Sequence, residues 1–239
     1  MGELVSGSQA VSAGKTSDRK FRPIWLFYAV LLLFLLGVVA FATLRPILVL
    51  PRITLAPGFS LTDQNGMRLT NEDMRGKLVL YNLTYTSCEP PCAQTSAVTQ
   101  EVMARLPELE NGAVPIEFVT ISIDPEHDTP EVLQAYAASL DADTSRWHFV
   151  TGPLERLKWV VGGGFRVYFD HKEDGRIVYD PAFMLVDGLG ILRAEYRTAD
   201  PGADRILSDM QLVIDEVQNS QGANKVAYEA AHLFMCYPS

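Results

Sequence analysis

The sequence predicts a mixed α/β domain preceded by a membrane-spanning helix. An uncharged apolar run from Ile24 to Leu44 has about the twenty residues that cross a bilayer as a helix. Beyond it, predicted strands and helices alternate and then give way to a hairpin and a closing helix, as in a mixed central sheet flanked by helices. The length of 239 residues suits one such domain with additional segments.

Charge and cysteine content narrow the classes of function. The formal net charge is −9, and no cluster of Lys and Arg suits a phosphate backbone, so we expect no nucleic-acid partner. Three cysteines are too few for a disulfide scaffold. A close pair with one left over is typical of a reactive or metal-binding site.

The flanks of the apolar run predict its orientation in the membrane. Four basic residues precede it closely and two follow it: Lys15, Arg19, Lys20 and Arg22, then Arg45 and Arg52. The positive-inside tendency then places the N-terminus in the cytoplasm and the domain in the periplasm or another extracytoplasmic space. Ala40-Phe41-Ala42 resembles a signal-peptidase site, but the run exceeds the usual signal-peptide core. We expect an uncleaved, single-pass anchor in the cell inner membrane.

We expect five segments along the chain. The first residues are rich in Ser, Gly and Ala and bury too little surface to fold, whereas prolines mark the stretch after the anchor. The expected segments are a cytoplasmic disordered tail (1–23), the transmembrane anchor (24–44), a linker (45–57), the α/β domain (58–219) and a C-terminal tail (220–239).

Local patterns predict the order of elements within the domain. Asn65-Gly66 between alternating runs predicts a hairpin, and Thr129-Pro130 predicts a helix start. Asn71–Met74 is expected to form one helical turn. Strands are predicted at 77–84, 115–124, 147–151, 176–186 and 191–196, and helices at 93–106, from Pro130 to about Ser139, at 153–161 before a glycine break at 162–164, and at 203–217. This order suggests thioredoxin-like topology.

Cys88 and Cys92 lie between a predicted strand and a predicted helix. Thiols near a helix N-terminus have a lowered pKa, which favours the reactive thiolate, although Glu89 adds an opposing negative charge. Spacing alone leaves three hypotheses: an inert disulfide, a metal site, or thiol–disulfide exchange. Two thiolates suit cuprous copper, but a stable site wants a third ligand, commonly an imidazole.

Two motifs together resemble the Sco/SenC family of membrane-anchored copper proteins. The first combines FSLTDQNG, RGKLVL and YTSCEPPC between Phe59 and Cys92, and the second is ISIDPEHDTPEVLQAYA from Ile121. The resemblance implies a thioredoxin-like fold, with copper held by the two cysteines and a distal histidine. It also implies delivery of copper to, or reduction of, the cysteines of the binuclear copper centre of cytochrome c oxidase. The implied partner is the copper-centre subunit or another copper or thiol protein.

The sequence departs from the family where a Val-Asp-His segment is expected. The matching stretch, Val178 to Asp187, has no histidine. Pro181 stands there instead, where thioredoxin-like oxidoreductases usually carry a cis-proline opposite their cysteines. This departure keeps two alternatives open, a metal-independent thiol–disulfide oxidoreductase and a redox- or copper-sensing interaction protein.

Other histidines are candidates for the third copper ligand. His171 lies in a predicted turn just upstream of the vacant position. His127 follows a predicted strand and is expected to help start a helix, and His148 is expected to be a strand or surface residue. The tail places His232, Met235 and Cys236 close together, which are soft ligands for copper, although we expect the tail to pack as an apolar segment. Cys236 could also pair with Cys88 or Cys92, or with another protein.

Overall fold

The computed structural model describes residues 23–44, 48–88, 92–110, 112–220, 222 and 224–234, without the side chains of 23, 41–44, 92, 93, 233 and 234. The chain divides into two compact units, 1–44 and 45–239. The first contains helix α1 (Pro23–Leu44), which has no charged residue. Over the described residues, which include the side chains of 24–40, no helix reaches the length and hydropathy of a membrane span. The predicted disordered tail lies outside the described residues, apart from residue 23.

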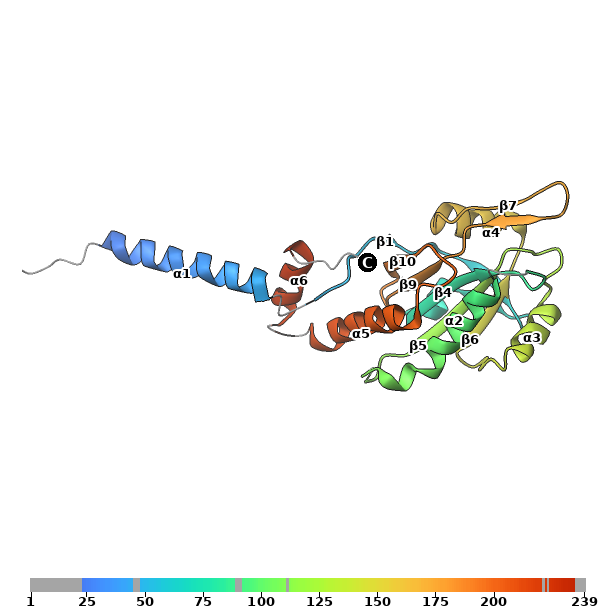
Figure 1. Ribbon diagram of the computed structural model, residues 1–239, viewed down its shortest axis with the longest axis horizontal. Helices are drawn as coiled ribbons and strands as arrows, with labels where there is room; N and C mark the ends of the chain where they lie inside the picture. The colour runs from blue at the N-terminus through green and yellow to red at the C-terminus, as the bar shows by residue number, and fades with distance from the viewer. Residues whose placement is uncertain are drawn as a thin grey trace, which may run out of the picture. The chain divides into compact units, whose positions relative to one another are not determined.

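The second unit is an α/β domain built on an eight-stranded sheet (Figure 1). The strands are β1 (Thr54–Leu55), β2 (Ser60–Asp63), β3 (Arg68–Thr70), β4 (Leu78–Thr84), β5 (Ile116–Ser122), β6 (Trp147–Thr151), β9 (Phe183–Val186) and β10 (Ile191–Tyr196). A separate two-stranded sheet joins β7 (Phe169–His171) and β8 (Ile177–Tyr179). The helices are α2 (Cys92–Ala104), α3 (Pro130–Ser139), α4 (Leu154–Leu157), α5 (Ala203–Asn219) and α6 (Asn224–Phe234), with 3₁₀ turns η1 (Asn71–Met74) and η2 (Leu106–Glu108) and a π-helix, η3 (Lys158–Gly164).

The strand order is β1-β10-β9-β4-β5-β6-β2-β3. The three middle strands β4, β5 and β6 are parallel, and the pairs outside them are antiparallel. All seven residues of β4 are buried, as expected for a strand with neighbours on both sides and layers over both faces. The predicted α/β class and the central strand are therefore confirmed.

Side chains of β4 alternate between two hydrophobic cores. Leu78 and Leu80 belong to the core under α2, α3 and α5, whereas Val79, Tyr81 and Leu83 belong to the core under α4 and η3. Helices α2 and α5 pack against each other over the first face (Figure 1). This alternation follows from the two-residue period of a strand.

Two local predictions are confirmed. Asn65 and Gly66 form the turn of the β2/β3 hairpin, where the backbone N–H of Asn65 donates to the Asp63 carboxylate at 2.9 Å and Gly66 has a φ of 75°. Thr129 caps α3, because its hydroxyl accepts from the backbone N–H of Val132, and Pro130 is the first helical residue.

The predicted helix at 153–161 does not break at Gly162. Instead α4 widens into η3, which continues to Gly164 and closes with the N–H of Phe165 donating to the carbonyl of Val160. A Cβ at Gly164 would lie 2.3 Å from the Cβ of Pro57, so the close approach of these two segments requires glycine there. The glycines at 162–164 therefore belong to the π-helix, and Gly164 allows Pro57 to pack closely against it.

The predicted strand at 176–186 is two strands in different sheets. Ile177–Tyr179 pairs with β7, whereas Phe183–Val186 pairs with β4 and β10. Between them, the N–H of Asp180 donates to the carbonyl of Tyr168 rather than to the main sheet. Pro181, which has no N–H to donate, lies in this link.

The domain also extends beyond both predicted boundaries. In the stretch predicted as a linker, Val49 and Leu50 are fully buried and β1 pairs with the edge strand β10. In the predicted C-terminal tail, residues 224–234 form α6, and Ala231 is fully buried. Apolar side chains from the predicted linker and from the predicted tail thus pack into the folded domain.

Candidate functional site

The cysteine loop begins where β4 ends. Residues 85–88 follow Thr84, and the backbone N–H of Cys88 donates to the carbonyl of Tyr85 at 3.2 Å. Cys88 is half-buried and disulfide-bonded. Helix α2 begins at Cys92, whose side chain lies outside the described part of the structure. The predicted strand–loop–helix arrangement around Cys88 is therefore present.

Asp128 holds the cysteine loop in place. Its fully buried carboxylate accepts from the backbone N–H of Thr86 at 3.0 Å, from the Thr86 hydroxyl and from the Ser122 hydroxyl. Three donors satisfy an anion that would otherwise be costly to bury. Asp128 thereby ties the loop after β4 to the loop after β5. Asp128 was not predicted as a site residue, because nothing local in the sequence shows which distant donors its carboxylate meets.

His127 lies beside Asp128 but points to solvent. Its Nδ1 contacts Asp124 at 2.9 Å, and this hydrogen bond raises the pKa of the imidazole. The side-chain cap of α3 comes from Thr129, whose N–H donates to the carbonyl of His127 at 3.0 Å, so the part of His127 in starting the helix stays a prediction. The carboxylate of Asp124 favours the protonated, cationic imidazole.

His171 lies on strand β7 and not in an exposed turn as predicted. Its half-buried ring places Nε2 2.7 Å from the carbonyl oxygen of Ile123. Because a carbonyl can only accept, Nε2 carries the hydrogen, and in the neutral imidazole Nδ1 keeps a lone pair. The N–H of Ile123 in turn donates to the carbonyl of Thr84 at 3.0 Å. His171 is thus at the end of the sheet from which the cysteine loop departs.

Pro181 and Tyr179 also lie at this end of the sheet. Asn82 of β4 pairs with Phe183, the first residue of β9, and Pro181 lies two residues before Phe183 in the link that leads into β9. The rings of Tyr179 and Tyr85 meet edge to face at a centroid distance of 6.1 Å. Burial raises the pKa of Tyr179, so its phenol remains neutral.

His148 is confirmed as a strand residue, since it lies in β6 with Nε2 3.0 Å from a carboxylate oxygen of Glu117.

Among the described side chains, which do not include Cys92, no group of three His, Cys, Asp or Glu residues is arranged to hold a metal. The metal-binding roles of Cys88, Cys92 and His171 therefore all stay predictions.

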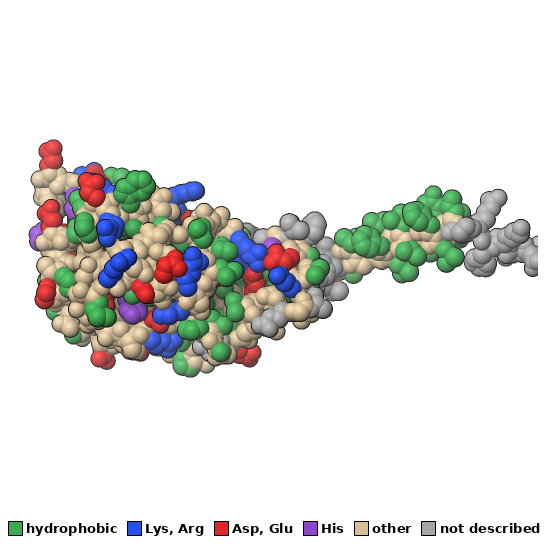
Figure 2. Space-filling model, turned by 180° about the vertical axis from the view of Figure 1, so that it is seen from behind, with side chains coloured by type: hydrophobic (Ala, Val, Ile, Leu, Met, Phe, Trp, Pro, Cys, Tyr) green, Lys and Arg blue, Asp and Glu red, His purple; other side chains and the backbone are tan. Residues whose placement is uncertain are grey.

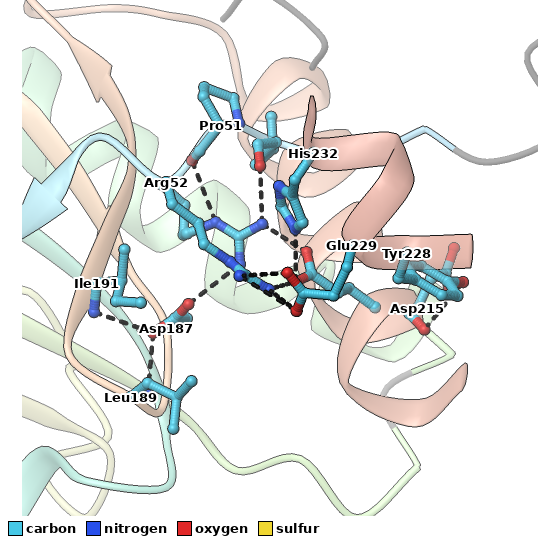
Figure 3. Close-up of polar contacts among 12 residues, drawn as sticks. Pro51, Arg52, Asp187, Leu189, Ile191, Asp215, Tyr228, Glu229 and His232 are labelled. Atoms are coloured by element: carbon cyan, nitrogen blue, oxygen red, sulfur yellow. Dashed lines mark hydrogen bonds and ion pairs between the residues drawn. The ribbon is translucent and has the colours of Figure 1, made fainter. Parts of the chain in front are cut away.

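A second polar cluster lies at the opposite end of β4 (Figure 3). Arg193 is 2% exposed, and its guanidinium donates to Asp187 at 3.0 Å, to Glu216, and to the carbonyls of Leu50 and Pro51 at 2.8 and 3.2 Å. A buried arginine is stable only when anions and acceptors surround it in this way. We call this set the Arg193 cluster.

Glu216 extends the Arg193 cluster to segments from the two ends of the domain. Its carboxylate contacts Arg52 at 3.0 Å and His232 of α6 at 2.8 Å, while Glu229 of α6 also pairs with Arg52 (Figure 3). Burial opposes ionisation of Glu216, but hydrogen bonds from Arg193, His232 and Arg52 hold its pKa below the usual range. His232 thus helps hold α6 on the domain, and Met235 and Cys236 lie outside the described residues.

A comparison with protein families decides what kind of domain this is. The family model described as SCO1/SenC matches residues 51–215. The chain belongs to the SCO1/SenC family. Two relatives are an SCO1 protein homolog of Bacillus subtilis and a putative copper-binding protein of Stutzerimonas stutzeri. The first is 24% identical over 64% of this chain and 79% of its own length, and the second is 25% identical over 73% of this chain and 82% of its own length.

A solved structure of another Sco protein has the same fold. BsSco, described as having a disulfide switch and as a member of the Sco family of cytochrome c oxidase assembly proteins, aligns with a TM-score of 0.60 at 22% identity. The alignment covers 69% of this chain and 95% of BsSco. The domain is therefore a thioredoxin-like Sco fold. Helix α6 and the side chain of Glu216 lie beyond the residues that the SCO1/SenC model matches.

Proposed function

We propose that this Sco protein delivers copper to, or reduces the cysteines of, the binuclear copper centre of cytochrome c oxidase through Cys88 and Cys92. The observation that carries the proposal is a disulfide-bonded Cys88 in the loop between β4 and α2, held by Asp128. The relatives support it, because one is named as copper-binding and another as an oxidase assembly protein.

The proposal includes a membrane anchor. Residues 24–44 carry no charge, and more basic residues lie close before them than after them. We place the N-terminus in the cytoplasm, a single helix in the cell inner membrane and the Sco domain in the periplasm or another extracytoplasmic space. Such an anchor would hold the domain near a membrane-bound oxidase.

For copper delivery, the reduced pair would supply two thiolates. Thiolates and imidazole suit cuprous copper, and we propose His171 as the third ligand through Nδ1, since Nε2 is engaged with Ile123. The hydrogen bond to the carbonyl fixes the tautomer that leaves Nδ1 available. Copper is the cargo, and its transfer to a partner's cysteines exchanges ligands without net oxidation.

For thiol reduction, Cys88 and Cys92 would both be reduced at the start. A Cys88 thiolate attacks one sulfur of the partner's disulfide, which breaks that bond and forms a mixed disulfide. The Cys92 thiolate then attacks the Cys88 sulfur and releases the partner as a dithiol. This chain ends with a Cys88–Cys92 disulfide, and the two electrons have passed to the partner. A dithiol reductant must restore the starting state.

The alternative is a metal-independent thiol–disulfide oxidoreductase. The place of Pro181 just before β9, which pairs with β4, favours it, because thioredoxin-like oxidoreductases usually carry a proline opposite their cysteines. The lack of a histidine between Val178 and Asp187 also favours it. In this case His171 would only support the loop through its bond to Ile123.

Anaerobic titration of the reduced, full-length protein in detergent with cuprous ion tests the proposal. We expect one copper per chain, lost in Cys88→Ser and bound at least tenfold more weakly in His171→Ala. His148→Ala is the matched control, because the imidazole of His148 on β6 contacts Glu117 on β5, and this variant should bind copper as the wild type does. Absence of copper binding together with disulfide-reductase activity would establish the alternative.

A further inference from the structure

An exposed aromatic and basic surface lies around the π-helix η3. Trp159 is 78% exposed and Tyr168 is 51% exposed. Four cations lie near these aromatic residues. Arg156, Lys158 and Arg166 are close to them in the sequence, and Arg68 joins them because Arg68 and Arg156 both donate to Ser60. We call these six residues the Trp159 surface. An exposed tryptophan beside arginines has the composition of binding hot spots in protein interfaces.

The four cations of this surface make no ion pair with any described residue. Arg156 donates to the carbonyl of Ser60 at 2.6 Å and Arg68 donates to the Ser60 hydroxyl at 2.8 Å, so both guanidiniums converge on one residue. The chain as a whole carries a net charge of −9. A local excess of positive charge on an acidic protein is complementary to an acidic partner.

Three open hollows lie on this surface, and Trp159 lines two of them. A hollow of about 350 Å³ is lined by Pro153, Glu155, Arg156 and Trp159, and another of about 310 Å³ is lined by Glu155, Lys158, Trp159 and Gly163. A third, of about 360 Å³, lies between Lys158 and Tyr168. At Gly162, in the lining of this third hollow, an added Cβ would meet nothing within 4 Å. Such hollows accept protruding side chains of a partner protein, whereas a lipid surface would require a broader apolar wedge.

The chain connects this surface to the candidate site. Tyr168 and Phe169 line the third hollow, and Phe169 begins strand β7, whose last residue, His171, contacts the carbonyl of Ile123. A partner bound at the Trp159 surface would therefore rest on the segment that carries the proposed third ligand.

We infer that the Trp159 surface docks an acidic face of the protein that exchanges copper or electrons with Cys88. This inference rests on the proposed function and names where the partner binds. The cations steer encounter, and Trp159 supplies the apolar anchor.

The test measures reaction of the reduced, full-length protein in detergent with the oxidised, soluble copper-centre domain of the oxidase from the same organism. We expect Trp159→Ala to lower the second-order rate about tenfold and Lys158→Glu to lower it similarly. The wild-type rate should fall as salt increases, and Lys158→Glu should weaken that dependence. Lys225→Glu on α6 is the matched control, because it changes net charge equally outside the Trp159 surface.

A small dithiol separates docking from chemistry. Reduction of the oxidised protein by dithiothreitol should proceed at the wild-type rate in Trp159→Ala and Lys158→Glu. Wild-type rates with the copper-centre domain in both variants would overturn the inference, as would an equal loss in Lys225→Glu. If the two variants lose binding to phosphatidylglycerol vesicles but react with the copper-centre domain at the wild-type rate, the surface binds the membrane instead. If the wild type itself does not react with the domain, the proposed function fails and the inference fails with it.

Discussion

The two ends of strand β4 carry two kinds of buried polar cluster. At the cysteine end, Asp128 accepts hydrogen bonds from the neutral donors of Thr86 and Ser122, and no cation among the described residues pairs with it. At the other end, Arg193 meets the carboxylates of Asp187 and Glu216 directly. Both clusters hold loops on the same sheet. The first holds the loop that carries Cys88, whereas the second balances its charges and braces the two ends of the domain.

The largest effect is expected where charge balance is removed. Arg193→Met leaves Asp187 and Glu216 as buried carboxylates without their common partner, so we expect the free energy of unfolding to fall by about 4 kcal/mol. Urea unfolding measures this loss. Arg197→Met removes an exposed pair with Glu195 and should cost less than about 1 kcal/mol. A comparable cost for both variants would contradict the bracing role of the Arg193 cluster.

At the cysteine end, Asp128→Ala leaves the donors of Thr86 and Ser122 without their acceptor. We expect a loss of about 2 kcal/mol in the free energy of unfolding and faster amide hydrogen exchange at Thr86. Asp128→Asn keeps the shape and one carbonyl oxygen, so it should recover much of the protection. Unchanged exchange at Thr86 in the alanine variant would show that another contact holds the loop.

Acid should weaken the Arg193 cluster through Glu216. The pKa of Glu216 is lowered in the folded protein, so its stabilisation is fully present above the unfolded pKa of about 4.3 and is lost as pH falls through the folded pKa. Urea unfolding between pH 7 and pH 3 should show this loss in the wild type. In Glu216→Gln this loss of unfolding free energy with falling pH should be absent. If the free energy of unfolding falls equally steeply with pH in both proteins, the loss does not come from Glu216.

The smallest effect is expected at the rim of the Arg193 cluster. The pair between Arg52 and Glu229 is partly exposed, so Glu229→Gln should cost about 0.5 kcal/mol in urea unfolding. A loss as large as that of Arg193→Met would mean that α6 depends on Glu229 and not on the buried contact between His232 and Glu216.

Short-range signals predicted most of the fold, and long-range pairing explains the errors. The strand at 176–186 was predicted as one because Ile177–Tyr179 and Phe183–Val186 are both strand-like, and only their different partners, β7 and β4, separate them. Residues 48–57 and 224–234 lack a signal strong enough to show that they pack on the domain. At the site, spacing indicated Cys88, but the contact of His171 with Ile123 depends on a strand pairing that local pattern does not reveal.

The sequence by itself determined the features that depend on neighbouring residues. These are the buried run of β4, the Asn65-Gly66 hairpin, the Thr129 cap and the location of Cys88 between a strand and a helix, because each follows from local backbone preference or side-chain period. Tertiary structure alone decided the partners of Asp128 and Arg193. A buried charge is tolerated only when distant segments bring its donors or counter-charges together, and that convergence is a property of the folded chain.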